Sequence, residues 1–134
     1  MPELPEVETI RRQLAPKLID AAIVDAGAHW SAKFTPALEA VGMEIVGARR
    51  RGKYLLFDLD PGADGGPPRE LVVHLGMTGR LAVPEPGSAL ALDDPATEPH
   101  LRAWWRLDDD RVLTFHDIRR FGRIHVVDKG DYRN

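Results

Sequence analysis

The sequence contains no cysteine, which excludes disulfides, thiolate zinc sites and a catalytic thiol, and fits a reducing compartment. It has no apolar run approaching the roughly 20 residues of a membrane helix. Its N-terminus, MPELPEVE, is acidic and lacks the apolar stretch of a secretion signal. With 134 residues, 43% hydrophobic and 29% charged, the chain has the composition of one globular domain, and we expect a cytoplasmic protein without a membrane segment.

The sequence also lacks an excess of positive charge, because its formal net charge is −3. A protein that coats nucleic acid is normally basic, so this balance argues against that class. The basic residues are nevertheless clustered, in residues 49–53 and 119–123, while acidic residues gather in 58–70 and 93–110. This distribution leaves room for a basic face on an acidic domain.

One amphipathic helix is predicted near the N-terminus. Apolar residues recur there at helical spacing: Val7, Ile10, Leu14 and Leu18. Pro5 suits the first turn, where its missing N–H costs nothing, and Pro16 is expected to end or kink the helix. The segment 35–41 predicts a second, brief helix with Thr35 as its N-cap.

Most of the remaining chain has the pattern of β-structure. Short runs separated by Gly, Pro or Asp predict strands at 21–26, 43–48, 54–59, 71–75, 80–83, 101–107, 111–116 and 123–127. The Pro- and Gly-rich segments 61–68 and 84–99 are expected to be exposed loops. We therefore predict a mainly β fold with flanking helices, in which two sheets form a sandwich or flattened barrel.

The N-terminus carries a possible nucleophile. Methionine before a small residue is usually removed, which would expose Pro2 as a free secondary amine with Glu3 beside it. An α-amino group titrates at about 7.7–8.0, so part of it is neutral and nucleophilic at pH 7. The alternative is structural: Met-Pro is a common start, and Glu3 and Glu6 then serve only to stabilise the helix N-terminus.

Four strings in the chain form an ordered set: PELPEVE at 2–8, RRGKYLL at 50–56, HLGMTG at 74–79 and DIRRFG at 117–122. Together they resemble the motifs of formamidopyrimidine-DNA glycosylases, whose relatives in the endonuclease VIII group usually have Gly at the place of Leu4. The resemblance corresponds to the family's N-terminal catalytic domain, which we expect to span residues 1–134. The family's helix–two-turn–helix module and zinc finger are absent from this chain. A structural zinc is expected only in that finger, with no metal or other cofactor here.

The resemblance implies a set of catalytic residues at the start of the chain and in the second motif. Pro2 would attack the sugar, Glu3 would protonate the ring oxygen, and Glu6 would support them. Lys53 resembles the lysine that contacts the DNA phosphate and assists base release. From the residues alone, Lys53 reads as a solvated lysine at a strand edge, and the neighbouring arginines 49–51 fit a solvated face as well as a phosphate contact.

The resemblance also implies DNA-binding residues. Met77, Arg119 and Phe121 would fill the gap left by a flipped nucleotide, because a flipped base leaves a hole and an unpaired partner. His74 would lie near a phosphate and His100 in a loop that approaches DNA. Without the family, Met77 and Phe121 read as core residues, and the histidines as structural ones.

The adjacent tryptophans at 104 and 105 allow at most one base-stacking side chain, because neighbouring strand residues point to opposite faces. We expect the other to lie in the core.

The resemblance predicts an N-glycosylase that removes oxidised purines, of the 8-oxoguanine and formamidopyrimidine type, from double-stranded damaged DNA. An associated AP lyase activity would cleave the strand by β,δ-elimination through an iminium at Pro2. The expected protein is a monomer of the bacterial cytoplasm, associated with the nucleoid. The alternatives are a catalytically inactive damaged-DNA-binding module of the same fold and a plain β domain, and the isolated 134 residues are expected to have weak or no activity.

Overall fold

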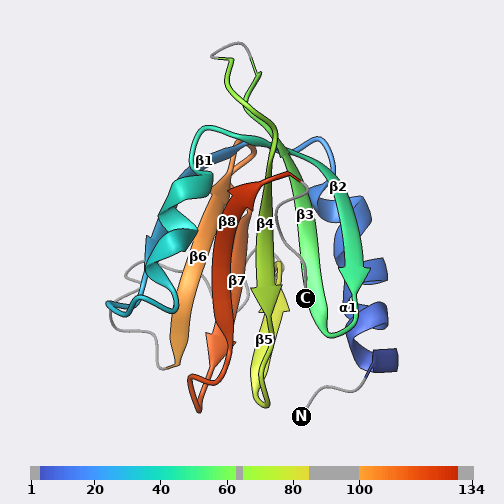
Figure 1. Cartoon of the computed structure of the whole chain (residues 1–134), viewed down its shortest axis with the longest axis vertical. Helices are drawn as coiled ribbons and strands as arrows, with labels where there is room; N and C mark the ends of the chain where they lie inside the picture. Colours follow the sequence, from blue (N-terminus) through green and yellow to red (C-terminus); the bar gives the residue numbers. More distant parts are fainter. Residues whose placement is uncertain (1–3, 63–64, 85–99, 130–134) are drawn as a thin grey trace.

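A computed structural model describes residues 4–62, 65–84 and 100–129. The described elements are α1 (Leu4–Leu18), β1 (Ile23–Ala28), the 3-10 helix η1 (Thr35–Ala40), β2 (Glu44–Arg51), β3 (Tyr54–Asp60), β4 (Arg69–His74), β5 (Gly79–Ala82), β6 (Leu101–Leu107), β7 (Val112–Asp117) and β8 (Arg123–Asp128). The strands form two four-stranded antiparallel sheets, ordered β1-β6-β7-β5 and β2-β3-β4-β8 (Figure 1). The predicted mainly β, two-sheet fold is therefore confirmed.

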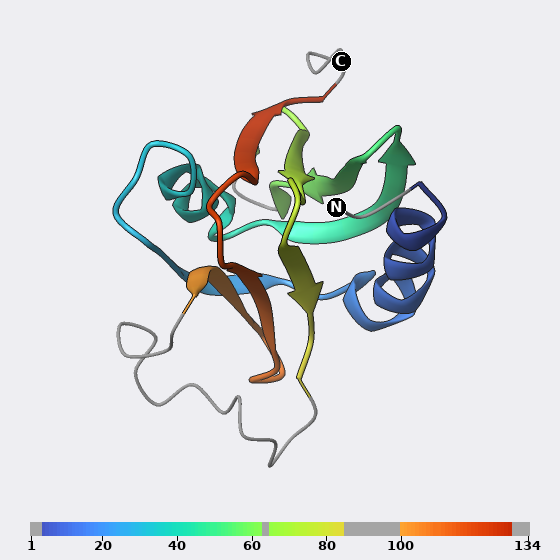
Figure 2. The ribbon, with the colours of Figure 1, turned by 90° about the horizontal axis from the view of Figure 1, so that it is seen from below.

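The two sheets enclose an apolar core because alternate residues of each strand point inward. Leu55, Phe57 and Leu59 of β3 are buried there, and Trp105 and Phe115 of the opposite sheet are fully buried in the same cluster. Helices α1 and η1 lie at opposite sides of this sandwich (Figures 1 and 2). The helices therefore flank the sheets, as predicted.

Helix α1 follows the predicted apolar stripe, since Val7, Leu14 and Leu18 are buried in the core. The prediction that Pro16 ends or kinks the helix is wrong as to its end, because α1 continues through Pro16 to Leu18. Proline removes one hydrogen bond in the last turn, but Leu18 is fully buried and the Ile19 amide still donates to the Ala15 carbonyl at 3.0 Å. Core packing thus overrides the local signal.

The second helix begins as predicted at Thr35, but Thr35 is not its N-cap. Phe34 occupies the cap position without a side-chain cap hydrogen bond, and the helix has 3-10 geometry. Phe34 is fully buried, and the Trp105 indole Nε1 donates to the Ala37 carbonyl at 3.0 Å. Tertiary contacts, rather than a polar cap, therefore hold η1 in place.

Three turns meet at one end of the sandwich, the lower end in Figure 1. The β2–β3, β4–β5 and β7–β8 turns are brought there by strand register, since Tyr54 pairs with His74, His74 with Arg123, and Gly79 with Asp117. The N-terminal end of α1 lies at the same end (Figure 1). The three motifs at these turns and the described part of the first motif, residues 4–8, therefore converge on one end of the fold.

Candidate nucleic-acid interface

The end of the sandwich where the motifs meet carries exposed positive charge. Arg51 and Arg123 are exposed on either side of Tyr54 and His74, and Lys53 lies half-buried in the β2–β3 turn. The rings of Tyr54 and His74 are 4.7 Å apart between centroids. This row of residues, built by strand register alone, is suited to an anionic ligand such as a phosphate.

His74 is held as a neutral imidazole. Its Nδ1 accepts a hydrogen bond from the Gly76 amide at 3.0 Å, which leaves the ring proton on Nε2. Partial burial, followed by the positive charges of Lys53 and Arg123, lowers the pKa of His74 below its ordinary value. A neutral ring can still donate from Nε2, so His74 can serve as a hydrogen-bond donor to phosphate.

The predicted void-filling residues are exposed. The residue exposures of Met77 and Phe121 are 42% and 47%, and Arg119 is exposed as well. The Arg119 guanidinium carbon lies 5.2 Å from the centroid of the Phe121 ring. The alternative that Met77 and Phe121 are core residues is therefore wrong.

The arginines at 49–51 do not all fit the same one of the two alternatives, a solvated face or a phosphate contact. Arg49 binds Asp58 at 3.0 Å and Glu70 at 2.5 Å, and Arg50 binds Glu8 at 3.2 Å. These two arginines mainly neutralise carboxylates of the chain itself. Arg51 is exposed at the motif end, so it is the member of the run best placed to attract a phosphate.

The N-terminal end of α1 is fastened to strand β2. Glu8 accepts hydrogen bonds from Arg11, Arg12 and Arg50, and Arg11 also donates to the Ala48 carbonyl at 3.3 Å. The hydrogen bond from Arg11, opposed by partial burial and supported by Arg12 and Arg50, lowers the pKa of Glu8 to about 2. This anchoring holds the helix start beside the basic row.

The predicted nucleophile and its neighbour, Pro2 and Glu3, lie outside the described residues. They directly precede Leu4, the first residue of α1. Glu6 is exposed in the first turn of that helix.

His100 and the two tryptophans lie on β6 and just before it. His100 is exposed with a φ of 67°, and its carbonyl accepts the Asp117 amide at 2.9 Å. Trp105 is fully buried, whereas Trp104 is half-buried on the other face. The prediction that one tryptophan lies in the core is confirmed.

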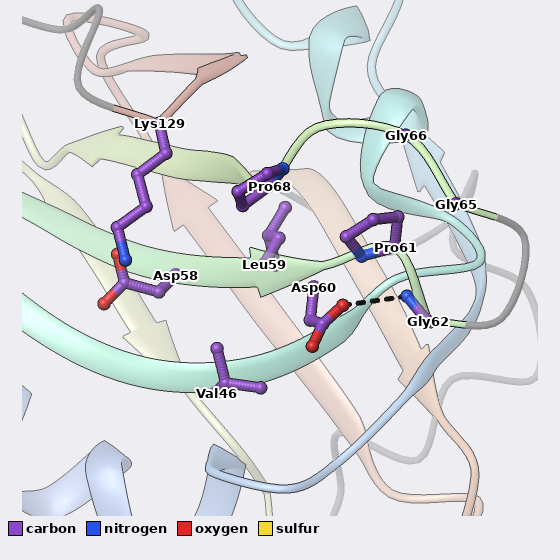
Figure 3. Close-up of a pocket in the computed structure, with 10 residues that line it drawn as sticks. All are labelled: Val46, Asp58, Leu59, Asp60, Pro61, Gly62, Gly65, Gly66, Pro68 and Lys129. Carbon is purple, nitrogen blue, oxygen red and sulfur yellow. Dashed lines mark hydrogen bonds between the residues drawn. The ribbon is translucent and has the colours of Figure 1, made fainter.

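A pocket of about 350 Å³ lies at the other end of the sheet, beside the β3–β4 loop (Figure 3). Its carboxylates already have partners, because Asp58 binds Arg49 and Asp60 Oδ1 accepts the Gly62 amide at 2.9 Å. The pocket is therefore remote from the converging motifs and carries no arrangement suited to their chemistry.

Residues 4–62, 65–84 and 100–129 contain no cluster of three or more His, Asp or Glu side chains that could hold a metal ion. No helix in those ranges is long and apolar enough to cross a membrane.

The chain is similar to known proteins over nearly its whole length. The family model described as the formamidopyrimidine-DNA glycosylase N-terminal domain matches residues 1–124. The formamidopyrimidine-DNA glycosylases of Chloroflexus aggregans and Thermus thermophilus are 42% and 43% identical, over 96% and 99% of this chain. The matches cover only 44% and 43% of those relatives, so the chain spans less than half their length.

Solved structures show the same similarity. The crystal structure of the MutM (Fpg) protein from Thermus thermophilus matches with a TM-score of 0.77 and 41% identity, over 98% of this chain and 42% of that one. The Lactococcus lactis Fpg protein, solved in complex with a DNA containing FAPY-dG, matches with a TM-score of 0.75 and 30% identity, over 95% of this chain and 44% of that one.

Proposed function

Because the chain belongs to the formamidopyrimidine-DNA glycosylase family, we propose that the natural protein carrying it excises oxidised purines from double-stranded DNA and then cleaves the strand as an AP lyase. The observation that carries this proposal is the convergence of the motifs. Exposed Met77, Arg119 and Phe121 lie at the same end as the basic row and the start of α1. A duplex laid across this end would meet an apolar wedge and positive charge together.

In the proposed reaction the damaged nucleotide is flipped out and its sugar C1′ is presented to the Pro2 nitrogen. Attack by this nitrogen breaks the glycosidic bond, and the base leaves with the bonding electrons and is protonated. Glu3 donates its proton to the ring oxygen, which opens the sugar and yields an iminium at Pro2. This chemistry uses an amine and a carboxylic acid and needs no metal.

The iminium explains the proposed strand cleavage. It acidifies the C2′ proton, whose loss expels the 3′ phosphate by β-elimination. A second elimination expels the 5′ phosphate, and hydrolysis of the iminium by water then frees the sugar remnant, regenerates the Pro2 amine and leaves a one-nucleotide gap. Lys53 is assigned to a DNA phosphate and to assistance in base release, and Glu6 to support of the helix start.

The proposal extends to the parts of the protein beyond this chain. Residues 1–134 are assigned as the catalytic domain, and a helix–two-turn–helix module and zinc finger would supply the other side of the DNA grip. The chain has no cysteine, so it cannot itself provide the thiolate ligands of such a finger. We assign the protein to the nucleoid, since its proposed substrate is chromosomal DNA. We also assign it as a monomer.

Borohydride trapping tests the proposed nucleophile. Reduction of the iminium should join the natural protein covalently to duplex DNA that carries an oxidised purine or an abasic site. Pro2→Gly should trap far less protein, and the mature protein should lack Met1. Equal trapping by Pro2→Gly, or retention of Met1, would contradict the mechanism. Selective binding of lesion duplex without excision or trapping would instead identify an inactive damaged-DNA-binding module.

A further inference from the structure

The proposed chemistry assigns no role to the buried carboxylate of Asp117. Asp117 ends strand β7 and is fully buried. Its Oδ1 accepts the Thr78 hydroxyl at 2.6 Å, and its Oδ2 accepts the Gly122 amide at 2.7 Å. A buried carboxylate requires such partners, because burial without them is costly. The two partners come from different turns, β4–β5 and β7–β8.

Thr78 extends this connection. Its hydroxyl donates to Asp117 and accepts the Arg119 amide at 3.1 Å, so both of its hydrogen-bonding functions face the β7–β8 turn. Thr78 directly follows Met77, and Gly122 directly follows Phe121. The Asp117–Thr78 pair therefore bonds to the backbone of Arg119 and to that of Gly122, beside Phe121, while Thr78 itself is the chain neighbour of Met77.

The two turns also touch through their backbones. Gly76 has a φ of 62°, and a Cβ placed there would lie 2.6 Å from the Phe121 carbonyl carbon and 2.7 Å from the Gly122 nitrogen. A Cβ on Gly122 would lie 2.7 Å from the His74 carbonyl oxygen. Side chains at both positions are therefore excluded, and this close fit leaves the turns little room to move separately.

Other contacts fix the β7–β8 turn from its far side. Arg102, itself buried, donates from Nε to the Asp117 carbonyl at 2.8 Å. The Lys33 ammonium donates to the carbonyl of Arg120 at 2.7 Å, and Arg120 has a φ of 58°. A non-glycine residue in that conformation is held by its surroundings. The turn is thus braced on the side away from Thr78.

We infer that Asp117 and Thr78 are positioning residues that lock the two turns into one preformed wedge, so that Met77, Arg119 and Phe121 enter the duplex together. The inference rests on the proposed function and adds to it a pair of residues that touch no DNA. Two independent turns would each lose conformational freedom on insertion, whereas a locked unit has lost it already. Loss of the lock should slow base flipping and leave the Pro2 chemistry intact.

Single-turnover excision from lesion duplex tests the pair in the natural protein. Asp117→Asn and Thr78→Val should each slow excision about tenfold or more, the scale of a lost hydrogen bond to a buried charge. Thr78→Ser keeps the hydroxyl and should restore most of the rate. Thr114→Val is the matched control, because Thr114 is a buried threonine whose hydroxyl donates to the Ala82 carbonyl away from the wedge.

Three readouts separate positioning from a general loss of stability. The double variant should be no slower than the slower single variant, since residues acting as one unit are non-additive. In the Pro2→Gly background, 2-aminopurine beside the lesion should report slower unstacking for Thr78→Val than for Thr78→Ser. Amide exchange should rise in both turns, at Gly79 of the β4–β5 turn as well as at Arg119 and Gly122 of the β7–β8 turn, in both Thr78→Val and Asp117→Asn and whether or not the protein is active.

Several results would overturn the inference. Excision by an active parent that is unchanged in Asp117→Asn and Thr78→Val would do so, as would equal slowing in Thr114→Val at matched melting temperature. Faster amide exchange in one turn alone would show that the turns are not coupled. A parent that neither excises nor traps would contradict the proposed function instead, and amide exchange would still decide the coupling.

Discussion

At the scale of single residues, Met77 and Phe121 are notable for where they are exposed. Both are large apolar side chains in turns, and both are exposed at the end where the motifs meet. Scattered exposed apolar residues are ordinary, but two beside an exposed arginine and a basic row form a localised patch. Their position fits insertion into a base stack better than a contribution to folding.

Met77→Ala and Phe121→Ala should therefore keep the fold while slowing excision from duplex DNA. Stacking of an inserted side chain is worth about 1–3 kcal/mol per base, so the flipped state loses that much. Exposed substitutions usually alter unfolding free energy by less than about 0.5 kcal/mol. The melting temperature and the single-turnover excision rate of each variant should be measured and compared with those of the parent. Unaltered excision with a large loss of melting temperature would mean that both residues stabilise the domain instead.

His74 predicts a dependence of stability on pH. Its folded pKa is lowered, so below the unfolded pKa, near 6.5, the unfolded chain takes up a proton that the folded chain resists. Stability should therefore fall as pH drops from about 7.5 to 5.5. His74→Asn offers Oδ1 to the Gly76 amide but does not titrate, and should show a weaker fall. The pKa of His29 is also lowered, so part of the fall in stability with pH will be common to the parent and to His74→Asn. Urea unfolding at several pH values gives the free energy of unfolding as a function of pH. If His74 does not contribute, this free energy will change with pH equally in the parent and in His74→Asn.

At the scale of elements, the attachment of α1 decides where the first turn of that helix lies. The helix is held by its buried stripe and by Glu8, whose carboxylate joins Arg11 and Arg12 of the helix to Arg50 of β2. The stripe fixes the face that packs, while the ion-pair network fixes the end of the helix beside the β2–β3 turn. The proposed nucleophile depends on this attachment because it precedes α1 directly.

Glu8→Gln should weaken this attachment and change the acid stability of the protein. The pKa of Glu8 is about 2 in the folded chain and near 4.5 when unfolded, so its stabilisation is present above pH 4.5 and is lost as pH falls toward 2. The variant should have a lower free energy of unfolding than the parent at pH 7, and this free energy should fall less on acidification. Glu44→Gln is the control, since no ion pair of Glu44 is found within the described part of the chain. An equal loss of unfolding free energy on acidification in Glu8→Gln and in the parent would contradict the attachment.

At the scale of the whole molecule, charge limits what this chain can do alone. The net charge is −3, and part of the positive charge is engaged in internal pairs, since Arg49 and Arg50 bind carboxylates of the chain. The main basic groups at the motif end are Arg51, Lys53 and the arginines of residues 119–123. Base flipping costs a few kcal/mol, which must be recovered from contacts on both sides of a lesion.

Residues 1–134 alone should therefore fold cooperatively but bind lesion duplex weakly and turn over far more slowly than the natural protein. Each phosphate neutralised contributes about 0.9 to the slope of log affinity against log salt, so the few phosphates in reach predict a shallow slope. Titration of fluorescent lesion duplex at several salt concentrations measures it. Nanomolar binding at physiological salt with a steep slope would show that this domain carries the DNA grip by itself.

Local patterns in the sequence were sufficient for the mainly β fold, the amphipathic helix, and the burial of one tryptophan of the adjacent pair. Each depends on side-chain periodicity within a few residues, which the backbone geometry of helix and strand translates directly into a buried face. The four motifs, in their order along the chain, were sufficient for the family. Those motifs also contain Thr78 and Asp117, but nothing in their spacing indicates that the two side chains bond.

Only the tertiary structure decided how residues distant in sequence share a partner. Thr78 and Asp117 are 39 positions apart, and Arg49 reaches Glu70 across 21, so strand register rather than local pattern brings them together. Tertiary packing also explains two predictions that were wrong, the N-cap at Thr35 and the end of the helix at Pro16. Burial of Phe34 outweighs the preference for a polar cap, and burial of Leu18 outweighs the effect of a proline in the helix. Local propensities are worth about 1 kcal/mol, with proline nearer 3, and the burial of a large side chain is comparable or greater, so packing decides such conflicts.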